Sequence, residues 1–191
     1  MVVGVLLALL WAALVYVSVP WWGAAMTAQD RIGASVVTAL AGSGMALLVP
    51  HIAFWQVGLV AILAVVAAVD WRHHIILNRF VVAALFWGGI ARSAYGHWFW
   101  AVILGGAVFL FYLMVHVVTH GGLGMGDVKL AGVLAFGLGY PSGLVSVVAG
   151  MWAAGIFALV LVVSRRRGSG VMALGPFLAV GGFVGLLDLV H

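Results

Sequence analysis

The stretch WFWAVILGGAVFLFYLMVHVV, residues 98–118, decides the fold of this chain. It is apolar almost throughout and contains no Asp, Glu, Lys or Arg. A helix rises about 1.5 Å per residue, so an uninterrupted run of this length is enough to cross a hydrocarbon layer of about 30 Å. The stretch therefore predicts a transmembrane helix.

The rest of the chain has the same character. Of its 191 residues, 66% are hydrophobic and only 6% are charged, whereas soluble domains carry about 25% charged residues. We therefore expect an all-α polytopic membrane protein, with residues 1–191 forming a single membrane domain. The apolar runs predict eight spans, at residues 2–19, 32–49, 52–69, 80–95, 98–118, 128–138, 144–164 and 171–190.

Two of these spans need comment. Residues 128–164 would form a helix about 55 Å long if unbroken, so we place a turn at Gly139-Tyr140-Pro141-Ser142-Gly143. The short sixth span is then expected to begin below the membrane surface. In the span 80–95, Arg92 is expected to extend its guanidinium to the interface.

The basic residues predict the orientation. Connectors on one side carry Arg31, Arg72, Arg79 and Lys129 together with Arg165, Arg166 and Arg167, whereas the other side carries Arg92. By the positive-inside rule, the first side faces the cytoplasm and both termini lie outside. The net charge of +4 suits a lipid bilayer, and we expect no nucleic-acid partner.

Other kinds of site receive little support. The chain has no cysteine, which excludes disulfides and thiolate metal sites. His116 and His120 share one helix face and Asp127 follows, but Val117 stands where a zincin has glutamate. We therefore expect neither a metal nor a cofactor.

The four acidic residues are the chemical candidates, because an acid in a membrane segment is costly. Asp30 adjoins Arg31 in an expected connector, and Asp188 lies near the end of the last span. Asp70 closes the third span and Asp127 opens the sixth, both at the cytoplasmic edge. Asp70 and Asp127 can therefore meet.

Two adjacent carboxyl groups share a proton and titrate in two separate steps. The ionised group can then take a proton from water while the protonated one polarises a peptide carbonyl. Asp70 and Asp127 are thus candidates for peptide hydrolysis. Alternatively, they are separate interface residues paired with Arg72 and Lys129.

Glycines surround Asp127, in the stretch Gly121-Gly122-Leu123-Gly124-Met125-Gly126-Asp127-Val128-Lys129-Leu130. Glycine lets the backbone take unusual conformations and lets another chain come close. A protease that binds an extended substrate needs such access.

In these residues the sequence resembles the type IV prepilin peptidases, which are GxGD-type intramembrane aspartyl proteases. Residues 124–130 match the family motif G-x-G-D-V-K-L in full, and Asp70, Arg72, Ile76 and Asn78 match its first motif. Leu77 stands where proline is common, and residues 173–177 are a weaker form of a third block, P-F-G-P-F. The resemblance implies a peptidase core of six helices over residues 52–191, preceded by two helices in residues 1–51. It also implies catalytic roles for Asp70 and Asp127 and supporting or substrate-binding roles for Gly124, Gly126, Lys129, Arg72, Asn78, Gly175 and Pro176.

The implied reaction is removal of the class III leader peptide of type IV prepilins or pseudopilins, after a glycine, at the cytoplasmic face of the plasma membrane. Many members also methylate the new terminus through an inserted domain with four cysteines. Here only residues 20–31 stand in that place and cysteine is absent, so we expect the monofunctional form that serves Flp-type pili.

Two other functions would use the same aspartates. A proton-coupled transporter would employ them as relay groups, although transporters place such groups near the midplane and often contain repeats. A non-catalytic membrane assembly factor is the second alternative. The sequence leaves open which prepilin is cleaved and whether the protein forms oligomers.

Overall fold

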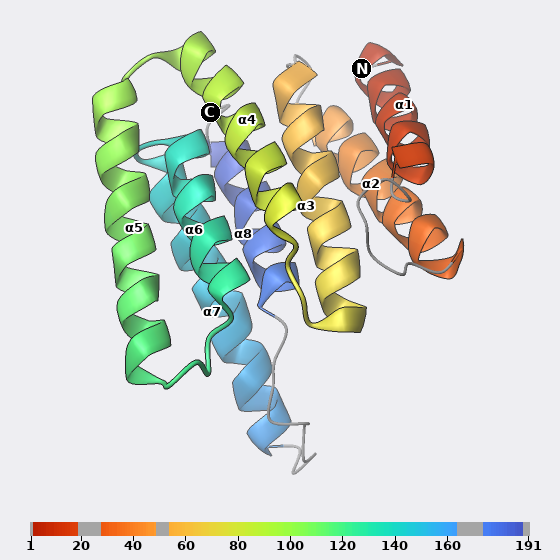
Figure 1. Ribbon diagram of the computed structural model, residues 1–191. Coiled ribbons are helices and arrows are strands. Elements are labelled where there is room, and N and C mark those ends of the chain that lie inside the picture. The colour runs from red at the N-terminus through yellow and green to blue at the C-terminus, as the bar shows by residue number, and fades with distance from the viewer. Residues whose placement is uncertain (1, 19–27, 49–53, 164–173, 189–191) are drawn as a thin grey trace.

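The computed structural model describes residues 2–18, 28–48, 54–163 and 174–188, which form eight α-helices and, within these ranges, no strand (Figure 1). Helices are expected here because hydrocarbon offers no partners to backbone polar groups. The predicted all-α fold with eight helices is confirmed. The helices are α1 (Val2–Ser18), α2 (Ala28–Leu48), α3 (Phe54–His73), α4 (Asn78–Tyr95), α5 (Trp98–Val118), α6 (Met125–Leu138), α7 (Ser142–Val163) and α8 (Gly175–Asp188).

Three helical segments among the described residues are long and apolar enough to cross a membrane on their own. They are Trp55–His73 in α3, Trp98–Val118 in α5 and Ser142–Leu161 in α7. Shorter apolar segments lie at Ala8–Val17 and Gly175–Asp188. The chain is therefore a membrane protein, while a full crossing by each of the eight helices stays a prediction.

The helices run alternately up and down along the bundle (Figure 1). An 18-residue apolar stretch was compared in each of these three segments: 78% of the stretch in α3 is buried inside the bundle, against 22% in α5 and 22% in α7. α3 packs against α2, α4 and α8, and α6 packs against α4, α5, α7 and α8. The helices that carry Asp70 and Asp127 are thus interior, whereas α5 and α7 expose apolar side chains on the outside.

Glycines allow α4 and α5 to come close to α6. A Cβ at Gly88 of α4 would lie 2.9 Å from the Cα of Gly137 in α6, and a Cβ at Gly105 of α5 would lie 2.7 Å from the Cβ of Phe136. Small residues commonly mark helix contacts in membranes, where close packing replaces the hydrophobic effect.

The turn predicted between the sixth and seventh spans is confirmed, since α6 ends at Leu138 and α7 begins at Ser142. α6 has 14 residues and is therefore about 21 Å long. Figure 1 shows that it begins well inside the level reached by the ends of α5 and α7. Its first turn, which holds Asp127, is recessed within the bundle.

The prediction for Arg92 is wrong. This side chain is only 3% exposed, and it turns inward to the end of α6. Its Nε donates to the carbonyl of Gly137 and its Nη2 to that of Leu138, both at 2.9 Å. The last carbonyls of a helix have no partner within the helix, and Arg92 supplies donors to two of them.

Two boundaries also differ from the prediction. α2 already begins at Ala28, so Asp30 and Arg31 lie in a helix rather than in a connector. α3 continues to His73, so Asp70 lies about one turn inside the helix rather than at its end. The cluster Arg165, Arg166 and Arg167 and the predicted start of the last span at residue 171 lie outside the described residues.

Candidate active site

Asp70 is held by the beginning of α8. Its side chain is 3% exposed, and its Oδ2 accepts a hydrogen bond of 2.8 Å from the backbone N–H of Gly175. The first N–H groups of a helix have no partner within the helix and favour an anionic one. A Cβ at Gly175 would lie 2.7 Å from the same oxygen. Only glycine therefore permits this contact without a shift of the backbone or of Asp70.

Asp127 occupies the first turn of α6 and is 8% exposed. Its side chain folds back over the start of the helix, where a Cβ at Gly124 would lie 2.8 Å from Oδ2. The other oxygen, Oδ1, is buried and has no hydrogen-bond partner among the described residues. Such an oxygen is costly to bury unless a proton, a water or a substrate group reaches it.

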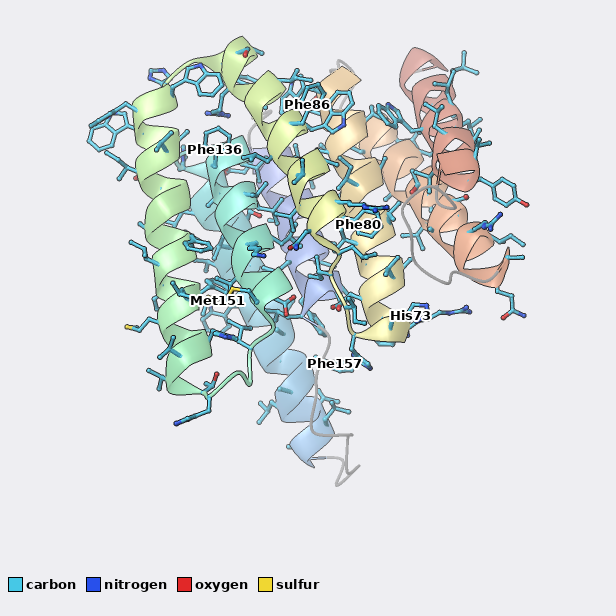
Figure 2. The ribbon with its side chains drawn as sticks, viewed as in Figure 1. His73, Phe80, Phe86, Phe136, Met151 and Phe157 are labelled. Carbon is cyan, nitrogen blue, oxygen red and sulfur yellow. The ribbon has the colours of Figure 1, made fainter. Side chains whose placement is uncertain are left out.

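The carboxyl groups of Asp70 and Asp127 lie within electrostatic range of one another. They come from different helices, and α8 packs against both α3 and α6. His73, next to the site on α3, and Phe157 lie toward one end of the bundle, whereas Phe86 and Phe136 lie toward the other (Figure 2). The pair is therefore near one end of the molecule but covered by side chains.

The start of α6 is joined at two points to the segment that follows Asp70, once at the α3–α4 connector and once at the first residue of α4. A Cβ at Gly126 would lie 2.7 Å from the Cβ of Ile76, so Gly126 lets the helix start rest on the connector. Lys129 Nζ donates to Asn78 Oδ1 at 2.9 Å, which links α6 to the first residue of α4. Both contacts fix α6 relative to the segment that follows Asp70.

The other predicted residues lie around this centre. Arg72 is exposed in the last turn of α3, and Pro176 follows Gly175 at the start of α8, half-buried. The ring of His116 is hydrogen-bonded through Nδ1 to the carbonyl of Leu123 and so fixes the α5–α6 connector. His120 is exposed. Among the described residues, no three His, Asp or Glu side chains converge as metal ligands would.

The sequence analysis missed Tyr112 of α5. This residue is 3% exposed, its buried hydroxyl has no hydrogen-bond partner among the described residues, and it lies within electrostatic range of Asp127. Besides its tryptophans, the apolar run 98–118 has polar groups only at Tyr112 and His116, and the hydroxyl of Tyr112 was the available signal. The spacing of that run could not reveal that the hydroxyl faces α6.

A recessed pair of carboxyl groups can perform acid–base chemistry on a peptide. Two such groups close together hold one proton more readily than none, because two adjacent negative charges repel. The pair can then activate a water and protonate the departing amine in turn. Gly124 and Gly175 keep side chains out of the space beside Asp127 and Asp70, respectively.

The sequence also resembles known proteins. Residues 57–159 match the model of the type IV leader peptidase family, a range that includes Asp70 and Asp127. The chain is also 35% identical over 88 residues to the prepilin leader peptidase/N-methyltransferase of Bacillus subtilis (strain 168). That match covers 45% of this chain and 36% of the relative, so the chain spans only about a third of the relative's length. No solved structure matches it significantly.

Proposed function

Because the chain belongs to the type IV leader peptidase family, we propose that it is a membrane-embedded aspartyl endopeptidase that removes leader peptides from prepilins. The observation that carries the proposal is the recessed pair of Asp70 and Asp127, which two separate helices bring within electrostatic range. The substrates are Flp-like prepilins or pseudopilins with class III leaders, cut after a glycine.

In this mechanism the two carboxyl groups share one proton. The ionised carboxylate takes a proton from a water, which attacks the scissile carbonyl, and the protonated carboxyl hydrogen-bonds to the carbonyl oxygen. Collapse of the tetrahedral intermediate returns a proton to the departing amine. The hydrogen bond from Gly175 orients Asp70, while the unpaired Oδ1 of Asp127 remains available to the water or the carbonyl.

The cytoplasmic location of the site belongs to the same proposal. Arg72, Arg79 and Lys129 lie on the helix ends and connectors near the two aspartates, whereas Arg92 belongs to the opposite end of α4 and is buried. This distribution supports a cytoplasmic site under the positive-inside rule.

The test is cleavage of a co-expressed prepilin with a basic leader that ends in glycine, followed as a shift on a gel. Asp70→Asn and Asp127→Asn should each abolish cleavage while the protein remains inserted at normal abundance. An amide nearly preserves the volume of the carboxyl group but cannot take a proton from water. The double variant should be little worse than either single one, because the pair acts as a unit.

The matched controls are Asp30→Asn and Asp188→Asn, of which Asp188 is exposed at the end of α8. Both should process the prepilin normally. Full processing by either Asp70→Asn or Asp127→Asn would contradict the proposal and would direct attention to the transporter and the assembly factor.

A further inference from the structure

A cavity lies at the end of the bundle opposite the two aspartates. It is a cavity of about 570 Å³, and it is lined by Arg92 of α4, by His97 in the α4–α5 connector and by Tyr140 in the α6–α7 turn. Neither Asp70 nor Asp127 lines it. The proposed peptidase mechanism leaves this cavity without a role.

The cavity is lined by a cationic side chain, Arg92, that no acidic side chain in the described part of the chain balances. Arg92 uses two of the five N–H donors of a guanidinium for the carbonyls of Gly137 and Leu138, and its Cζ lies 5.8 Å from the centre of the Tyr95 ring. No carboxylate among the described residues pairs with it. The C-terminus of a helix carries about half a negative charge, so part of the positive charge of Arg92 remains uncompensated.

The remaining walls of the cavity are apolar. Trp100, Ile103 and Leu104 line it along α5. Trp98, Phe99 and Trp100 are all exposed at this end of α5, as is typical of aromatic residues at the level of lipid headgroups. The cavity thus joins a cationic end to an apolar helix face at the expected depth of the membrane interface.

We propose that this cavity binds one anionic phospholipid, with its phosphate near Arg92 and His97 and an acyl chain along Ile103 and Leu104. A small anion would contact only the cationic end of the cavity and would leave its apolar wall unused. A zwitterionic lipid would place its own cation beside Arg92. An anionic headgroup with an attached chain satisfies both parts of the site.

The first measurement uses the full chain, purified in a neutral detergent. Its thermal unfolding is followed with added phosphatidylglycerol, with phosphatidylcholine of the same acyl chains, and with inorganic phosphate. We expect phosphatidylglycerol alone to raise the unfolding temperature and to remain bound in native mass spectrometry. Equal effects of the two lipids, or an effect of inorganic phosphate that matches phosphatidylglycerol, would overturn the proposal.

The second measurement uses variants that leave the contacts of Arg92 with α6 intact. Ala107 lines the cavity and is exposed on α5, so Ala107→Phe should fill the apolar wall and lower the bound phosphatidylglycerol at least fivefold. Leu110 is 62% exposed on the same helix and lies outside the cavity lining. Leu110→Phe should therefore retain the lipid. Equal retention by the two variants would overturn the proposal.

A matched pair of histidines tests the headgroup end. His97 and His120 are both exposed, with φ of 56° and 52°, and asparagine tolerates this conformation. His97→Asn should weaken retention of phosphatidylglycerol severalfold, and His120→Asn, at the other end of the bundle, should not. Unfolding temperatures without added lipid should be alike for all four variants. A loss of lipid that is the same for His97→Asn and His120→Asn would contradict the assigned position of the phosphate.

Discussion

The amide of Gly175 reaches Asp70 Oδ2 at 2.8 Å because no side chain separates them. An added Cβ would lie 2.7 Å from this oxygen and 2.9 Å from the Cβ of Asp70. Either the backbone at residue 175 or the side chain of Asp70 would have to move. The position of the carboxyl group is therefore set by a residue that contributes only its backbone.

Gly175→Ala is expected to lower the rate of prepilin cleavage by roughly tenfold to a hundredfold, because a displacement of about 1 Å at a reacting group has effects of that size. Cleavage rates and membrane abundance should be measured together. Gly89→Ala is the matched control, since a Cβ at Gly89 meets nothing within 4 Å. A fully active Gly175→Ala variant would show that the contact with Asp70 is dispensable.

Leu77 departs from the family motif, which commonly has proline at this position, yet the structure accommodates both residues. Its φ is −70° and its ψ is 136°, and the ring of proline fixes φ near −65°. Among the described residues, the Leu77 N–H donates no backbone hydrogen bond. The turn before α4 thus has the conformation that proline would impose.

Leu77→Pro should accordingly keep cleavage activity and stabilise the protein by about 0.4–1 kcal/mol, since proline reduces the freedom of the unfolded chain. Thermal unfolding in detergent and the cleavage assay would check this. Loss of folding in Leu77→Pro would mean that the Leu77 side chain, which packs against the core, matters more than its backbone.

At the level of helices, α4 and α6 meet backbone to backbone at Gly88 and Gly137. Gly88 and Gly137 lie so close that a Cβ on either would come within 2.9 Å of the Cα of the other. Gly89, the next residue in α4, has open space where a Cβ would be. The two adjacent glycines therefore offer an internal comparison.

Gly88→Val should destabilise the protein by about 1–3 kcal/mol, the usual cost of overpacking, and should lower cleavage because α6 carries Asp127. Gly89→Val should change the unfolding temperature little. Both variants can be compared by thermal unfolding in the same detergent. Equal unfolding temperatures would show that α4 and α6 tolerate separation.

The eight helices could be predicted from sequence because each is an apolar run bounded by turn residues. The break after Leu138 followed from the length of the run and from Gly139 and Pro141. The burial of Arg92 could not be predicted, because its acceptors, the carbonyls of Gly137 and Leu138, lie 45 and 46 residues away. The direction of the Tyr112 hydroxyl depends in the same way on how α5 packs on α6.

The position of the candidate site could be predicted from the sequence in outline. Asp70 and Asp127 stood out because acids are rare in this chain, and the resemblance pointed to Gly175. The reason for Gly175 required the fold, since its amide lies 105 residues from Asp70 along the chain. Likewise, only the structure shows that Lys129 bonds to Asn78.

At the scale of the whole molecule, the predicted orientation in the membrane can be measured by labelling cysteines. The chain contains no cysteine, so single cysteines can be introduced without background labelling. Arg72→Cys, Lys129→Cys and Arg166→Cys should resist an impermeant thiol reagent applied from outside, because the positive-inside rule places them in the cytoplasm. Labelling of Arg72→Cys or Lys129→Cys in intact cells would reverse the topology.

Tyr140→Cys is the control for this experiment. Tyr140 is 72% exposed in the α6–α7 turn, at the end of the bundle opposite the two aspartates, and it should react from outside. Permeabilised cells should label Arg72→Cys and Lys129→Cys as well, which shows that these cysteines can be reached.

The placement of Asp70 and Asp127 on separate helices also has a consequence for biosynthesis. Asp127 follows Asp70 by 57 residues (127 − 70), and a ribosome adds about 5–20 residues per second, so the second aspartate is synthesised roughly 3–11 s after the first. The amide that orients Asp70 is made later still. During this interval the nascent chain has only half of the proposed dyad, and the proposed protease would become active only when the last helix joins the bundle.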